Sequence, residues 1–163
     1  MNVGRILSSA LLPRAFAATR VDTRRELADR MEITALVDRL GRTLDEGRFA
    51  ELGAIYTADA TARTPGGRAR GRDALIAQAT RNHRPDYAIQ HFVTNTHIDL
   101  HGDHATVRAN LLVVFARKDA HTTPPASQYT LGEIYHFDAI RTAQGWRLSS
   151  VATDPVWAQG VRP

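Results

Sequence analysis

The longest regular pattern of apolar residues lies in the first third of the chain and has helical spacing. Its members are Leu27, Met31, Ile33, Leu36, Val37, Leu40 and Leu44. A stripe that recurs every three or four positions is typical of a helix with one buried face. Thr23 and Glu26 fit a capping box, and Gly47 suits the left-handed position that ends a helix. We therefore expect a helix over residues 23–45.

The pattern becomes strand-like in the second half of the chain. Long segments rich in β-branched and aromatic residues occupy 89–100, 105–117, 129–140 and 146–153. Turn residues at 101–103 and 142–145 join them as hairpins, and 118–126, which contains two prolines, is expected to be an exposed loop. Before these strands we expect a short helix with Phe49, Leu52, Ile55 and Tyr56 facing inward, a short strand at 59–64, a turn at 65–67 and a helix at 71–82.

This order of elements predicts an α+β domain in two layers, with an antiparallel sheet backed by helices on one face. A sheet of such long strands twists and can curl around the long helix, which leaves a cavity between them. The chain's 163 residues, 43% of them hydrophobic, fit one ordinary domain. We place this domain at 23–163, after an N-terminal arm at 1–22.

Charge and cysteine content narrow the function classes. With no cysteine, disulfides and thiolate sites are excluded. Arg5, Arg14 and Arg20, with no acid in the first 20 residues, carry three of the four net positive charges. The remainder is nearly neutral, so we expect neither a nucleic-acid surface nor a membrane span, and a cytoplasmic protein. The arm itself faintly resembles a secretory signal or a transit peptide; the alternative is an extension that covers a neighbouring subunit.

Two polar residues occupy unexpected positions for an apolar framework. Asp45 ends the long helix directly after Leu44, and His91 lies inside a predicted strand. An imidazole can carry a proton near neutral pH, and a carboxylate can fix its tautomer. The simpler interpretations are a solvated acid at a helix end and a half-buried histidine bound to backbone. The seven histidines show no metal-ligand spacing, and Gly66-Gly67 lacks a phosphate-loop context, so we expect no metal and no cofactor.

Several segments, in this order, are similar to SnoaL-like, nuclear transport factor 2-like domains. They are Arg39 to Leu52, Tyr56 to Ala60, Gly71 to Leu75, Gln90 to Asn95, Gly102 to Val107 and Gly145 to Leu148. The resemblance runs from about residue 23 to the end and implies a cone-shaped, mixed sheet around the first of three main helices. Within the superfamily, Gln90-His91-Phe92 and Asp45 resemble the scytalone dehydratase-like lyases. In those enzymes a histidine removes a proton next to a carbonyl and an aspartate orients it.

The chain also departs from that pattern. Leu44 stands where the dehydratase has a tyrosine, and 59–64 lacks the second tyrosine of the family. Those tyrosines hold the water that polarises the carbonyl, so the resemblance transfers the Asp45–His91 pair without the substrate, unless other side chains replace them. Asp138 stands at the position where we align an asparagine of the lyase. The expected binding residues are Asp138, Asn95, Tyr56 and Tyr135, with walls from Leu44, Phe92, Val113, Phe115 and Trp157.

Three hypotheses follow for the function. The first is a cofactor-independent lyase, isomerase or cyclase for a small organic molecule, acting by Asp–His proton transfer in an enclosed apolar pocket. The second is a binding or accessory protein that uses the same pocket without chemistry. The third is a structural assembly subunit. Because helices cover only one face of the predicted sheet, we expect a homodimer or a higher homo-oligomer in any case.

Overall fold

The computed structural model describes residues 14–118 and 124–163, with side chains from residue 23 onward. Its elements are α1 (Arg14–Asp45), η1 (Phe49–Ala54), β1 (Tyr56–Thr64), β2 (Gly67–Arg70), α2 (Arg72–Asn82), β3 (Tyr87–His101), β4 (His104–Arg117), β5 (Ser127–Thr142) and β6 (Gly145–Gly160). Most of the expected N-terminal arm, and the centre of the expected loop at 118–126, lie outside the described residues.

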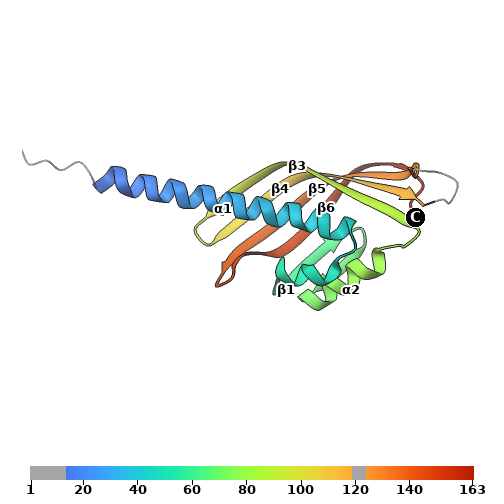
Figure 1. Ribbon diagram of the computed structural model, residues 1–163, viewed down its shortest axis with the longest axis horizontal. Coiled ribbons are helices and arrows are strands. Elements are labelled where there is room, and N and C mark those ends of the chain that lie inside the picture. Colours follow the sequence, from blue (N-terminus) through green and yellow to red (C-terminus); the bar gives the residue numbers. More distant parts are fainter. Residues whose placement is uncertain (1–13, 119–123) are drawn as a thin grey trace, which may run out of the picture.

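The strands form one six-stranded sheet in the order β2-β1-β6-β5-β4-β3. The neighbours pair antiparallel except β1 and β6, which are parallel, so the sheet is mixed as the resemblance implies. The long strands curve together, and α1 lies across them, with η1 and α2 near its C-terminal end (Figure 1). The predicted α+β fold, a curved sheet around a long N-terminal helix, is confirmed.

Helix α1 begins earlier than its apolar stripe suggested. It starts at Arg14, nine residues before the expected start at Thr23. The segment between contains three alanines and no proline or glycine, and Pro13 directly precedes it in the sequence. Alanine is the strongest helix former, whereas proline is tolerated at a helix start but disrupts a helix interior. Helix propensity therefore continues upstream of the capping box, and the helix extends with it.

The buried face of α1 is apolar only in its second half. Ile33, Leu36, Val37 and Leu40 are buried, but Leu27 and Met31 are 59% and 66% exposed, which corrects the prediction that they belong to the buried stripe. Between residues 23 and 32 the helix turns polar residues toward the sheet instead. Asp29 is buried, with 5% of its surface exposed. The spacing of apolar residues did not predict which side chains are buried here, because a buried carboxylate and an exposed leucine are both exceptions to the usual burial of apolar residues.

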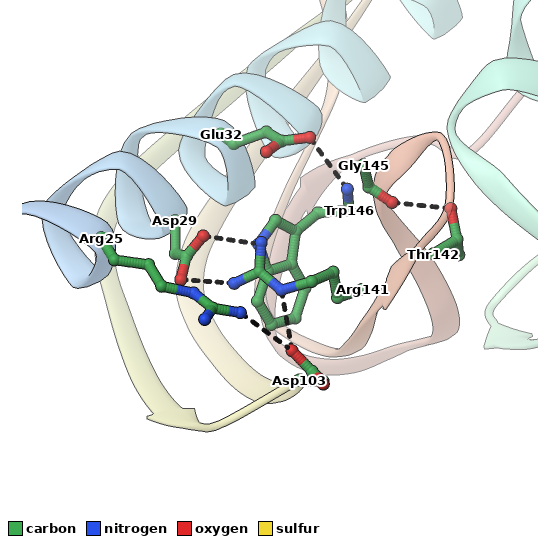
Figure 2. A network of polar contacts seen from close by, with 8 residues as sticks. All are labelled: Arg25, Asp29, Glu32, Asp103, Arg141, Thr142, Gly145 and Trp146. Carbon is green, nitrogen blue, oxygen red and sulfur yellow. Dashed lines mark hydrogen bonds and ion pairs between the residues drawn. The ribbon is translucent and has the colours of Figure 1, made fainter. Parts of the chain in front are cut away.

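A polar network explains the burial of Asp29 (Figure 2). The buried indole of Trp146 donates its Nε1–H to Asp29 Oδ1 at 3.2 Å, and Arg141 binds the other carboxylate oxygen of Asp29. Glu32 Oε1 accepts the backbone N–H of Trp146 at 2.8 Å. Arg141 also binds Asp103 at 2.8 Å, and its guanidinium lies 4.7 Å from the centre of the Trp146 ring. The network fixes α1 on the hairpin between β5 and β6.

Three strands also differ from expectation. Strand β2 pairs antiparallel with β1 after a turn at residues 65–66, and its polar sequence carried no strand signal. Tyr56 begins β1 instead of ending the short helix, and it is buried there. Strand β6 continues to Gly160, past the expected end at residue 153, because it remains paired with β5 throughout.

Neither α1 nor α2 combines the length and apolar character that crossing a bilayer requires, and η1 is shorter still.

Candidate active site

Asp45 and His91 are in contact. Asp45 is the last residue of α1, and His91 lies in β3 with its side chain on the concave side of the sheet. His91 Nδ1 lies 2.6 Å from Asp45 Oδ1, and the backbone N–H of His91 donates to the same oxygen at 2.9 Å. Gly47, with a φ of +66°, turns the chain just beyond α1, as its place in the sequence predicted. The helix end thus presents Asp45 to β3.

The hydrogen bond from His91 to Asp45 determines which ring nitrogen is free. When the imidazole is neutral and Nδ1 carries the proton donated to Asp45, Nε2 has a free electron pair. The two side chains are 13% and 23% exposed, so the pair is largely withdrawn from water. His91 lines the cavity and Asp45 supports it from behind. The arrangement can accept a proton at Nε2 and stabilise the resulting imidazolium.

The cavity beside His91 has a volume of about 390 Å³, which is large enough for a small organic molecule. Of the expected wall and binding residues, it is lined by Leu44, Tyr56, Val113, Phe115 and Tyr135. Tyr56 and Tyr135 are 6% and 5% exposed. Burial raises the pKa of both phenols, so both keep their protons over the physiological range. Each can therefore serve as a neutral hydrogen-bond donor.

Four of the expected binding residues do not line this cavity, namely Asp138, Phe92, Asn95 and Trp157. Successive side chains of a strand point to opposite faces, so Phe92, next to His91, and Asp138, between the buried Phe137 and Ala139, face outward. Asn95 sits at a break in the β3–β4 register with a φ of +53° and is exposed. These placements correct the prediction for each of them.

Trp157, half exposed, lies on the outer face over Gly132. Its partner across the β5–β6 pairing is Gly132, and a Cβ added there would lie 2.4 Å from the indole. Continuing across the sheet, Gly132 pairs with Leu112 and Leu112 with Phe92. Phe92, Leu112 and Trp157 therefore form a row on the convex face, which we call the outer apolar row. The missing side chain of Gly132 lets the indole lie flat in this row.

Glu133 lines the cavity, and sequence reasoning missed it. It is 6% exposed, and its Oε1 has no hydrogen-bond partner within the described protein. Burial raises the pKa of Glu133; the nearby Thr153 hydroxyl and the charges of His91 and Arg162 oppose this rise without cancelling it. The Thr153 hydroxyl makes no contact with full hydrogen-bond geometry. Strand alternation could have found Glu133, because it lies two residues from Tyr135, which was expected to face the pocket.

Exposed cations border the cavity near the α2 end. Arg81 lies in the last turn of α2 and Arg84 just after it. Arg162 comes from the C-terminal segment, where it donates to the Pro65 carbonyl at 3.3 Å. His83 also lines this side and makes an edge contact with Phe49 at 5.2 Å between ring centres. Among residues 23–118 and 124–163, no three histidine, aspartate or glutamate side chains gather in a way that would hold a metal ion.

Comparison with known families identifies the family to which this chain belongs. The family model of the SnoaL-like domain matches residues 25–152, which is most of the chain. The chain belongs to the SnoaL-like domain family. No curated protein sequence matches it.

Several solved structures have the same fold as this SnoaL-like chain. A putative scytalone dehydratase from Novosphingobium aromaticivorans is 18% identical, with a TM-score of 0.73, covering 86% of this chain and 93% of its own. The hexachlorocyclohexane dehydrochlorinase LinA-type3 from Novosphingobium barchaimii is 17% identical, with a TM-score of 0.71 and coverages of 83% and 92%. A nuclear transport factor 2-like protein with a cystatin-like fold, also from Novosphingobium aromaticivorans, is 26% identical, with a TM-score of 0.68 and coverages of 90% and 92%.

Proposed function

We propose that this protein is a cofactor-independent enzyme that transfers a proton at a carbon atom of a small organic substrate, as a lyase, isomerase or cyclase. The observation that carries the proposal is the 2.6 Å contact between Asp45 and His91 at the wall of the cavity. A solvated helix-end acid would not accept both the ring N–H and the backbone N–H of one half-buried histidine. Asp45 instead fixes the ring and leaves Nε2 free.

In the proposed reaction, His91 Nε2 takes a proton from the carbon next to a carbonyl group of the substrate. The electron pair of the broken C–H bond forms a carbon–carbon double bond, and the carbonyl electrons move onto its oxygen. The imidazolium then returns the proton to another carbon in an isomerisation, or to a departing hydroxyl in an elimination. Asp45 stabilises the cation throughout, and its negative charge orients the ring.

Two features support this chemistry. The described neighbours include a putative dehydratase and a dehydrochlorinase, whose names both denote eliminations. Leu44 stands where we expected the lyase tyrosine, but the buried phenols of Tyr56 and Tyr135 also line the cavity. As neutral donors they can bind a carbonyl oxygen in its place. Proton removal at His91 and hydrogen bonding from a phenol would then act on adjacent atoms.

Solvent exchange tests the proposal without knowledge of the substrate. A panel of cyclic ketones and β-hydroxyketones is incubated with the protein in D₂O, and α-proton exchange and water loss are followed by NMR. The wild type should accelerate one or both, and His91→Gln should reduce the rate by roughly 10²–10⁴-fold. Asp45→Asn should also reduce it, because an amide stabilises the imidazolium poorly. His97→Gln, on an exposed histidine of the same strand, is the control.

A binding protein without chemistry is the second candidate, and Leu44 is the observation that favours it. An apolar side chain beside Asp45 extends the apolar wall and supplies no group that could activate a substrate. Such a protein would bind members of the panel without exchange, and His91→Gln would change affinity alone. Exchange by the wild type that persists unchanged in His91→Gln would contradict the role assigned to His91.

A further inference from the structure

Glu133 is a polar group in the cavity to which the proposed function assigns no role. Its carboxyl is withdrawn from solvent, with 6% of the residue exposed, and Oε1 has no hydrogen-bond partner among the residues that the structure describes. Leaving a buried carboxyl oxygen unpaired costs free energy, so such an atom in a native protein needs an explanation. Because Glu133 also lines the cavity, a bound ligand can supply the missing partner.

The sheet register places Glu133 at a useful distance from His91. His91 on β3 pairs with Val113 on β4, and the next inward pair on the same strands is Val93 with Leu111. Leu111 pairs in turn with Glu133 on β5. Glu133 and His91 are thus two strands apart and offset by two residues along the strand, roughly 12 Å between backbones. Their side chains enter the same cavity over an apolar floor of Leu111 and Val113.

We propose that Glu133 binds, as a neutral carboxylic acid, the substrate oxygen on which negative charge develops while His91 holds the carbon-bound proton. A ligand lying across Leu111 and Val113 would meet both groups, one at each end. The substrate class is therefore an uncharged molecule with a carbonyl or comparable oxygen acceptor, separated from the reacting carbon by a short distance. The stabilisation of negative charge rests on the proposed function, because it requires the proton transfer to His91. The hydrogen bond from Glu133 to the ligand oxygen requires only that the ligand binds.

The charges around Glu133 agree with a protonated carboxyl. Burial is the largest influence and raises the pKa, and Asp154 adds to the rise. The Thr153 hydroxyl and the charges of His91 and Arg162 act in the opposite direction, and the pKa remains raised. Tyr56 and Tyr135, which also line the cavity, are uncharged phenols. Asp45, the remaining acid near the cavity, is engaged by His91.

Paired probes test the hydrogen bond. 2-Acetylnaphthalene has a carbonyl acceptor, and 2-ethylnaphthalene has nearly the same shape without one. Titration calorimetry over a series of pH values compares their affinities for the wild type, Glu133→Gln, Glu133→Leu and the control Asp138→Asn, which lies on the outer face of the same strand. Infrared spectra of the bound ketone in the wild type report directly whether its carbonyl accepts a hydrogen bond.

At low pH the wild type and Asp138→Asn should bind the ketone roughly two- to tenfold more tightly than the hydrocarbon. This preference should vanish as the pH rises through the ionisation of Glu133, and the carbonyl band should shift with it. Glu133→Gln, a permanent donor, should keep the preference at every pH, whereas Glu133→Leu should lack it.

A ketone that binds no better than the hydrocarbon at low pH, or a preference that survives in Glu133→Leu, would overturn the assignment. If the wild type catalyses no α-proton exchange but still binds the ketone more tightly than the hydrocarbon at low pH, the proposed reaction is refuted and the Glu133 hydrogen bond is supported. If the wild type catalyses exchange but binds both ligands equally well at low pH, the Glu133 hydrogen bond is refuted and the proposed reaction is supported.

Discussion

Replacing Asp29 with alanine should destabilise the protein by about 0.5–3.5 kcal/mol. The substitution leaves the buried Trp146 indole N–H without an acceptor, which costs about 1–3 kcal/mol. Arg141 loses one of its two carboxylate partners, but it is 24% exposed and keeps Asp103, so this loss contributes about 1 kcal/mol or less. The higher helix propensity of alanine offsets about 0.5 kcal/mol. For a chain of this length the melting temperature should fall by roughly 1–14 °C.

Urea unfolding followed by far-UV circular dichroism measures the change. Asp103→Ala is the matched control, because it removes the other Arg141 partner at a site where the side chain is 64% exposed, and it should cost under about 1 kcal/mol. If Asp29→Ala were no more destabilising than Asp103→Ala, the interpretation of the network as the anchor of α1 would be wrong.

The stabilisation that Asp29 contributes should also depend on pH. Burial acts to raise the pKa of Asp29, but the hydrogen bonds from Arg141 and Trp146 and the charges of Arg141 and Arg25 together lower it. A carboxyl with a lowered native pKa stabilises the fold above its unfolded pKa of about 3.9, and this contribution is lost as the pH falls through the native value. The difference between wild type and Asp29→Ala should therefore shrink in strong acid.

Further predictions concern the cavity and the outer face. Because the native pKa of Glu133 is raised, its stabilising contribution is present below an unfolded pKa of about 4.3 and is lost as the pH rises through the native value. Urea titrations should thus show Glu133→Gln more stable than wild type at high pH, with the gap closing in acid. The rate with an exchanging ketone should fall as the pH rises and Glu133 ionises, and Glu133→Gln should lose this fall. If the outer apolar row joins two copies, Trp157→Glu should reduce self-association in sedimentation velocity, whereas a wild-type monomer would contradict that expectation.

The sequence predicted the elements of this fold well because their signals are periodic. The stripe from Ile33 to Leu40 and the long β-branched strands each point to one structure, and both are present. The exposure of Leu27 and Met31 could not be foreseen, because it depends on Asp29 meeting Trp146 and Arg141 from distant parts of the chain. Local spacing carries no information on such a contact.

The candidate site was only partly accessible from the sequence. No periodicity could place Asp45 beside His91; that pairing came from the family resemblance alone, and their catalytic role stays a prediction. Strand alternation was the neglected signal on β5. Once Tyr135 faces the cavity, Glu133 must face it as well and Asp138 must not. Asn95 was beyond reach, because the register break that exposes it leaves no mark in the residue pattern.

The protonation state of the His91 ring tests the central claim most directly. In protein labelled with ¹⁵N-histidine, NMR should show neutral His91 carrying its proton on Nδ1, toward Asp45, with an unprotonated Nε2 that responds when 2-acetylnaphthalene fills the cavity. A proton on Nε2 in the neutral ring, or an Nε2 signal indifferent to the ketone, would contradict the proposal that His91 receives a substrate proton there.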